Sequence, residues 1–312
     1  MPLVSTADLV APARAAGRAV AAFNVITLEH AEAVAAGAER AGRPAVLQVS
    51  ENAVRFHGGD LSAVAAAAAA VARACRAPLA LHLDHVVTPE LLHAAHAAGI
   101  DSVMVDASRL GYGDNVKATA EAVRWGHARG MWVEAELGRV GGKAGEPPLH
   151  AHAPGVRTDP AEAAAYVAET GVDALAVAVG STHAMTERTA ALDHALIAAL
   201  RAAVPVPLVL HGSSGVPDAE LRAAVRAGMT KINVGTALNT AYTEAIRSHL
   251  SHAPATVDPR PYLTEAREAM TQTVAHFLTV VTTGADGTDG SGRPDRSDGS
   301  DGSGGPARAD RP

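Results

Sequence analysis

Three histidines end separate hydrophobic stretches of the chain: His85, His183 and His211. They are 98 and 28 residues apart in the sequence, so no local HxxxH spacing links them. If the fold brings them together, three imidazoles with an open fourth position form the usual ligand set of a catalytic zinc, a Lewis acid for a substrate oxygen. Asp84, next to the first histidine, is then a candidate general acid or base.

The elements that must position these side chains repeat along the chain. Eight short apolar runs alternate with alanine-rich helical stretches, which predicts a parallel sheet and fits a (β/α)8 TIM barrel. The alternative is a doubly wound sheet, but the segment AAFNVITLEH carries no glycine fingerprint after the first run. The runs are VAAFN (20–24), AVLQVS (45–50), LALHLDH (79–85), SVMVD (102–106), WVEAE (132–136), ALAVAVGSTH (174–183), PLVLHG (207–212) and TKINVG (230–235).

Polar side chains gather where these runs end, and a barrel brings the ends to one rim. Singly, an Asn, Asp or Ser there can be a helix cap, but together they favour a functional site. We expect the carboxylates at 106, 134 and 136 to orient the imidazoles or to ligate the metal themselves, and His82 to support the site from one layer deeper. The rim residues are Asn24, Ser50, Asp84, His85, Asp106, Glu134, Glu136, His183, His211 and Asn233.

Two glycine-containing loops follow the last two runs: HGSSG (211–215) and NVGT (233–236). Glycine lets backbone N–H groups approach a ligand, and Ser and Thr hydroxyls add donors. TIM barrels often bind phosphate in these two loops, with help from a helix N-terminus. The loops therefore predict a phosphate site beside the histidines.

The motifs HLDH, SVMVDAS, VEAELGRVGG, VAVGSTH, LVLHGSSG and KINVGT resemble, in the same order, the class II fructose-bisphosphate and tagatose-bisphosphate aldolases. The resemblance runs from about Ala21 to Met270. It implies a zinc enzyme that is a dimer or tetramer. A bound monovalent cation is a further possibility. Such an enzyme joins dihydroxyacetone phosphate to an aldehyde such as glyceraldehyde 3-phosphate, or cleaves the product.

The same resemblance implies roles for individual residues. His85, His183 and His211 match the zinc ligands, Glu136 matches a carboxylate that can contact the metal, and Asp84 matches the acid/base at the C4 oxygen. Arg260 matches an arginine that reaches the second phosphate, in some members from a neighbouring subunit. The remaining matches to substrate-binding positions are Asn24, Ser50, Ala184, Gly212, Ser213, Ser214, Asn233, Val234, Gly235 and Thr236.

Two positions differ from the family pattern. Ala184 stands where the family has a glycine, so a positive φ there would be strained. After Gly142 the chain reads Lys143-Ala144-Gly145, where the family has acidic residues that include a proton-transfer glutamate. Either Glu146, the first carboxylate of this loop, takes that role, or the substrate differs.

Composition excludes several classes of function. The net charge is −7 and no basic cluster occurs, which disfavours binding to nucleic acid or to an anionic membrane. The N-terminus has no signal-peptide pattern, and the single Cys75 suits a reducing compartment, so we expect a cytoplasmic protein. Apart from proline, residues 284–312 hold no apolar side chain larger than Ala, which predicts a disordered tail after a catalytic domain of residues 1–283.

Other functions remain open at this stage. Lys231 lies on the same strand face as Asn233 and could form a Schiff base with a ketone. A barrel hydrolase is disfavoured, because no HxH pair ends the first run. A non-catalytic relative that binds zinc and a phosphorylated sugar is a further alternative. The choice between fructose, tagatose or another ketose phosphate depends on geometry that the sequence does not show.

Overall fold

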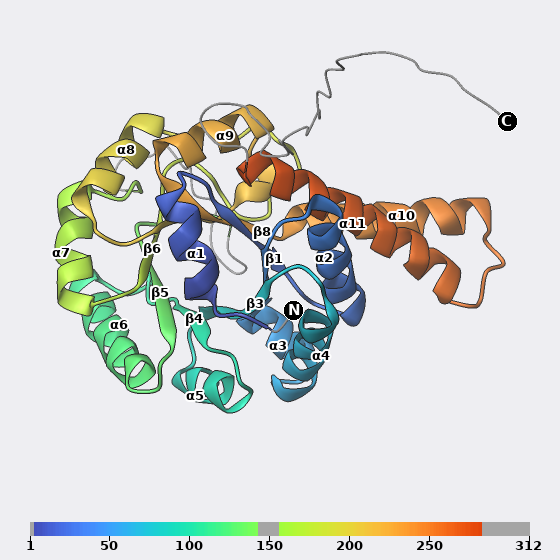
Figure 1. Cartoon of the computed structure of the whole chain (residues 1–312), viewed down its shortest axis with the longest axis horizontal. Helices are drawn as coiled ribbons and strands as arrows, with labels where there is room; N and C mark the ends of the chain where they lie inside the picture. The colour runs from blue at the N-terminus through green and yellow to red at the C-terminus, as the bar shows by residue number, and fades with distance from the viewer. Residues whose placement is uncertain (1–2, 143–155, 283–312) are drawn as a thin grey trace, which may run out of the picture.

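The computed structural model describes residues 3–142 and 156–282, and their strands close into one parallel barrel (Figure 1). Each strand pairs with the next in sequence, and the first pairs with the last. The TIM barrel predicted from the sequence is therefore confirmed. The strands are β1 (Val20–Asn24), β2 (Ala45–Ser50), β3 (Leu79–Val86), β4 (Ser102–Val105), β5 (Trp132–Leu137), β6 (Ala174–Val177), β7 (Leu208–Leu210) and β8 (Met229–Val234).

The helices surround the barrel, and most of them lie between consecutive strands (Figure 1). They are α1 (Thr6–Ala15), α2 (Leu28–Ala41), α3 (Glu51–Phe56), α4 (Ser62–Ala74), α5 (Pro89–Ala97), α6 (Tyr112–His127), α7 (Pro160–Thr170), α8 (His194–Ala203), the 3₁₀ turn η1 (Ser213–Gly215), α9 (Asp218–Ala227), α10 (Thr236–His252) and α11 (Arg260–Thr282).

Local sequence signals set several helix boundaries. Ser50 ends β2 and caps α3, because its Oγ accepts a hydrogen bond from the Ala53 N–H. Asp159 caps α7 in the same way, and Pro160 occupies the first helical position. At Ser50 the chain therefore switches from strand to helix directly at the rim.

The first helix closes the opposite end of the barrel. Leu9 of α1 packs against Val20, Val46 and Ala80, which lie at or next to the first residues of β1, β2 and β3. Because α1 covers the N-terminal ends of these strands, the C-terminal ends are left to form a site.

The sixth strand is shorter than predicted, since β6 ends at Val177 and not at His183. Ala178 already leaves the sheet: its N–H donates to Thr158 Oγ1, and its carbonyl accepts from the Thr158 N–H. The following Gly180 has φ of +127°, which a strand does not allow. The segment that carries His183 is thus a loop that rises above the sheet.

The helices α10 and α11 form a hairpin that projects from the barrel (Figure 1). The barrel end of α11 packs against α2, while the connection between the two helices lies far from the strands. Arg260, the first residue of α11, has a side chain 87% exposed and pairs with Asp258. The hairpin therefore presents Arg260 to the outside of its own subunit.

In the two described ranges, no helix is long and apolar enough to cross a membrane. The alanine-rich stretch AVAAAAAAVARAC (63–75) lies in α4 up to Ala74. The proposed tail at 284–312 and the loop residue Glu146 lie outside the described residues.

Candidate active site

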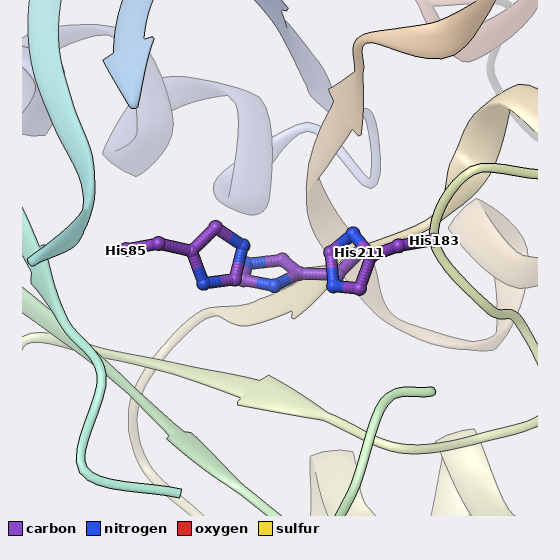
Figure 2. A group of neighbouring side chains, drawn as sticks. All are labelled: His85, His183 and His211. Carbon is purple, nitrogen blue, oxygen red and sulfur yellow. The ribbon is translucent and has the colours of Figure 1, made fainter. Parts of the chain in front are cut away.

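The three histidines meet at the C-terminal rim, as Figure 2 shows. One nitrogen from each imidazole lies within 4.8 Å of one nitrogen of both others. The ring of His85 lies 4.9 Å from that of His211 and 5.1 Å from that of His183, measured between centroids. The spacing in the sequence could not establish that the three histidines converge. The fold brings them together.

The backbone at His85 is irregular. Its φ is +53°, and the pairing of β3 with β4 shifts register between Leu83 and Val86, so His85 lies in a bulge. A bulge changes the direction in which a side chain points, here toward the other two imidazoles. Asp106 Oδ2 lies 2.8 Å from His85 Nδ1, and its other carboxylate oxygen accepts from the Ser108 hydroxyl. Asp106 thus holds the ring from behind, as the sequence suggested.

Close backbone packing positions His183. A Cβ at Gly142 would lie 2.3 Å from the His183 carbonyl oxygen, and a Cβ at Gly212 would lie 2.4 Å from the Thr182 carbonyl oxygen. The His183 N–H also donates to the Gly141 carbonyl at 2.7 Å. Only glycine fits at these two positions, both of which also have positive φ.

Ala184 follows His183 with φ of +58°, in the left-handed region. This is the geometry for which the sequence predicts strain, because an alanine Cβ approaches the next carbonyl there. The strain amounts to about 1–2 kcal/mol. Ala184 lines the cavity beside the imidazoles.

His211 lies between two carboxylates and is fully buried. Its Nε2 is 3.1 Å from Glu134 Oε1, and its Nδ1 is 3.0 Å from Glu136 Oε2. Burial alone would lower the pKa of His211, but the two carboxylates outweigh it and raise the pKa to about 9. The two carboxylates thus place negative charge beside both nitrogens of this imidazole.

Beneath the rim lies a set of charged and polar side chains with no exposed surface: Glu134, Lys231 and His82, which we call the buried ionic layer. Lys231 Nζ donates to Glu134 Oε2 at 2.8 Å. Burial would raise the pKa of Glu134, but Lys231 and His211 together hold it below its usual range. Burial and the charge of Lys231 lower the pKa of His82 to about 3, so this imidazole is neutral.

Asp84 lies between the layer and the rim and is 2% exposed. Burial opposes its ionisation, but His85, His211 and Lys231 outweigh this and lower its pKa. Gln48 Nε2 donates to Asp84 Oδ2 at 3.3 Å. An ionised, oriented carboxylate beside the imidazoles can accept a proton from a bound substrate.

His85 and His183 open into a cavity of about 410 Å³, a size that suits a small metabolite. Among the residues suggested by the sequence, the cavity is lined by Asn24, Ser50, Asp84, His85, Asp106, His183, Ala184, Gly212, Ser214, Asn233, Gly235 and Thr236.

Several other suggested residues lie outside this lining, among them His211 and Glu134, which are fully buried. Ser213 and Val234 are buried outside the cavity lining, and Ser213 Oγ donates to the Leu210 carbonyl. Glu136 lies beneath the lining against His211, and Arg260 is on the projecting hairpin.

Several lining residues were not singled out from the sequence, among them Gln48, Glu51, Arg55 and Arg109. Glu51 is 4% exposed, and its carboxylate accepts from the Val87 N–H at 2.6 Å and from the Arg55 guanidinium. Glu51 thereby anchors the segment after His85 and directs the Arg55 guanidinium toward the mouth of the cavity. The signal available in the sequence was ENAVR (51–55), which directly follows the second apolar run.

The donor set fits a divalent metal ion. Three imidazoles converge on one point, and the carboxylate of Glu136 contacts one of them, His211, at Nδ1. Zinc is commonly held by neutral imidazoles with an open position for substrate. His85, His183 and His211 would hold the ion, and Glu136, which the sequence also suggested as a ligand, contacts Nδ1 of His211.

Residues 4–286 match the family model described as fructose-bisphosphate aldolase class-II. The chain belongs to the class II fructose-bisphosphate aldolase family. It is 38% identical over 279 residues to the fructose-bisphosphate aldolase of Geobacillus stearothermophilus, covering 88% of this chain and 95% of that protein. It is 39% identical over 276 residues to the probable fructose-bisphosphate aldolase of Bacillus subtilis, with the same coverage of both proteins.

Among solved structures, the crystal structure of the YdjI aldolase from Escherichia coli K12 superposes with a TM-score of 0.77 at 30% identity, covering 92% of this chain and 100% of that one. This class II aldolase family consists of lyases that are typically metal-dependent and act on phosphorylated sugars. The resemblance seen in the sequence motifs is therefore confirmed.

Proposed function

We propose that this chain is a zinc-dependent aldolase that cleaves and forms a phosphorylated ketose, with fructose 1,6-bisphosphate as the first candidate. The observation that carries the proposal is the convergence of His85, His183 and His211 to within 4.8 Å beside the buried carboxylate of Asp84. A metal held there supplies a Lewis acid for a substrate carbonyl oxygen. The products would be dihydroxyacetone phosphate and glyceraldehyde 3-phosphate.

In the cleavage direction, Asp84 accepts the proton of the C4 hydroxyl group. The C3–C4 bond then breaks, the C4 oxygen becomes the carbonyl of the aldehyde, and the bonding electron pair stays with the ketone fragment. Returning a proton to C3 completes the reaction. Glu146 is the proposed donor of that proton and lies outside the described residues. Gln48 and Asn24 hydrogen-bond to each other beside Asp84 and keep its carboxylate oriented.

The phosphate of the ketone fragment has a proposed site between the last two rim loops. Ser214 Oγ accepts from the Gly235 N–H at 3.3 Å and from the Ala237 N–H at 3.0 Å, so it ties the loop after β7 to the start of α10. Gly212 and Thr236 line the cavity beside it. Backbone N–H groups and a helix N-terminus favour an anion.

The second phosphate needs a cation at the cavity mouth. We propose that the active form is a homodimer or homotetramer, in which Arg260 reaches the site of a neighbouring subunit. Its exposure on the projecting hairpin supports this, as does its position outside the cavity lining of its own chain. The proposed location is the cytoplasm, where the one cysteine, Cys75, stays reduced.

The test is a coupled cleavage assay over a panel of ketose phosphates that includes fructose and tagatose 1,6-bisphosphate. We expect one zinc per chain, loss of cleavage after chelation with EDTA, and recovery when zinc is returned. Activity that survives exhaustive chelation, with zinc shown to be gone, would overturn the metal proposal. A protein that binds zinc and dihydroxyacetone phosphate but cleaves no member of the panel would be a non-catalytic relative.

A further inference from the structure

Lys231 lies fully buried on β8 and donates to two acceptors. Its Nζ is 2.8 Å from Glu134 Oε2 on β5 and 2.9 Å from Asn233 Oδ1 on its own strand. Each acceptor leads to a different part of the site. The other oxygen of Glu134 contacts His211 Nε2, and Asn233 lines the cavity.

An ammonium group has three donors and no acceptor, which gives both contacts a direction. The amide of Asn233 must turn its oxygen toward Lys231, so its nitrogen points the other way. In the described part of the chain, Asn233 Nδ2 is buried and has no hydrogen-bond partner. A buried amide donor that lines a cavity is satisfied when a ligand oxygen binds there.

Lys231 also acts on His211, through its contact with Glu134. Glu134 Oε1 holds Nε2 of the ring, so Nδ1, which lies 3.0 Å from Glu136 Oε2, is the nitrogen left to bind a metal. A carboxylate behind a metal-binding imidazole fixes both the ring orientation and its tautomer. Lys231 in turn fixes the carboxylate, because the pair is fully buried and water does not compete.

We propose that Lys231 is a positioning residue with two outputs: through Glu134 it orients the metal ligand His211, and directly it turns the Asn233 amide so that its N–H₂ group donates to a substrate oxygen. The inference rests on the proposed metal site and gives Lys231 a role other than Schiff-base formation. Its ammonium group is held by two acceptors and does not line the cavity.

The experiment compares zinc affinity, by chelator competition on metal-stripped protein, in wild type, Lys231→Met, Glu134→Gln and the double variant. Lys117→Met is the matched control, because it removes an exposed positive charge from α6. The second readout is the affinity of each zinc-saturated protein for dihydroxyacetone phosphate. Cobalt substitution gives an absorption spectrum that reports on the geometry at the ligands.

We expect Glu134→Gln to weaken zinc binding by about 10–100-fold, as is usual for a residue that supports a ligand. Lys231→Met should weaken zinc binding by about tenfold, but add little in the double variant, since it acts through Glu134. Only the variants that lack Lys231 should also lose about two- to tenfold in dihydroxyacetone phosphate affinity, the effect of one hydrogen bond. Lys117→Met should match wild type in both readouts.

A folded Lys231→Met protein with zinc affinity within about twofold of wild type would overturn the inference, as would fully multiplicative effects in the double variant. If Lys231→Met does not fold, the double variant carries the test, because it leaves no unpaired buried charge. Wild-type zinc and dihydroxyacetone phosphate affinities in that variant would equally overturn the inference. Failure of the wild type itself to bind zinc would instead refute the proposed function.

Discussion

The rim and the buried ionic layer beneath it are built in different ways. At the rim, His85 and Ala184 have positive φ, and His183 stands on a loop packed against two glycines. In the layer, Glu134 and Lys231 lie inside the strands β5 and β8 and have no exposed surface. The metal ligands His85 and His183 therefore lie on irregular backbone, whereas Glu134 and Lys231, which support His211, lie within strands of the sheet.

This difference has a physical reason. A regular strand projects side chains at fixed intervals of two residues, which suits a rigid support. Three imidazoles at or after the ends of three strands can converge on one point only where bulges and loops change the direction of the side chains. The cost is local strain at the rim, which the packed barrel below can tolerate.

The largest expected effect comes from the carboxylate that connects the two regions. Asp84→Asn should lower kcat by about 10²–10⁴-fold, because it removes the proposed proton acceptor while keeping the shape of the side chain. Zinc content should stay at the wild-type level. Steady-state kinetics with metal analysis checks this, and Asp114→Asn on the exposed surface of α6 is the control. A loss below tenfold would remove Asp84 from the proton transfer.

The buried layer should respond strongly to loss of one partner and weakly to loss of both. Lys231→Met should reduce the free energy of unfolding by about 3–5 kcal/mol, because it leaves the Glu134 carboxylate buried without its counter-ion. The double variant Lys231→Met with Glu134→Leu should be close to wild type in stability. Urea denaturation of the metal-free proteins measures both. Equal destabilisation in the two variants would show that the layer is not held by this ion pair.

At the rim, a single methyl group should disturb the imidazoles. Gly142→Ala should lower the free energy of unfolding and weaken zinc binding, because its Cβ would collide with the His183 carbonyl oxygen. Gly130→Ala is the control, since Gly130 also has positive φ but nothing within 4 Å of the added Cβ. Both variants carry the conformational strain of about 1–2 kcal/mol. If Gly130→Ala weakens zinc binding equally, close packing on His183 is not the cause.

The smallest expected effect has the opposite sign. Ala184→Gly should raise the free energy of unfolding by roughly 0.5–1 kcal/mol, because it relieves about 1–2 kcal/mol of strain while the unfolded chain becomes more flexible. Ala70→Gly at an exposed position inside α4 should instead reduce it by about 1 kcal/mol. Denaturation curves give both values. A loss of stability in Ala184→Gly would mean that the left-handed backbone there carries little strain.

Much of the barrel could be predicted, because its strands are local. A strand such as AVLQVS is a run of apolar residues bounded by turn signals, and the structure places β2 at the same residues. The end of β6 could not be predicted in this way. Ala178 bonds to Thr158, and this partner is distant in sequence.

The residues of the candidate site likewise divide into those that the sequence could identify and those that it could not. His85, His183 and His211 could be identified because each ends a run and matches a family motif. Arg55 and Arg109 could not be identified, because an arginine near a strand end has many ordinary surface roles. Their place in the cavity lining follows from how helix α3 and the loop after β4 are packed, which the sequence pattern does not determine.

The sequence alone thus determined the order of the strands, the rim at which they end and the types of side chain delivered there. These features depend on local hydrophobic pattern and on short motifs. Only the tertiary structure decided which partners meet: Lys231 is 97 residues from Glu134 in sequence, yet the two are joined across the barrel. A buried charge is stable only beside its partner, and that partner is set by strand register and barrel closure rather than by the residues on either side.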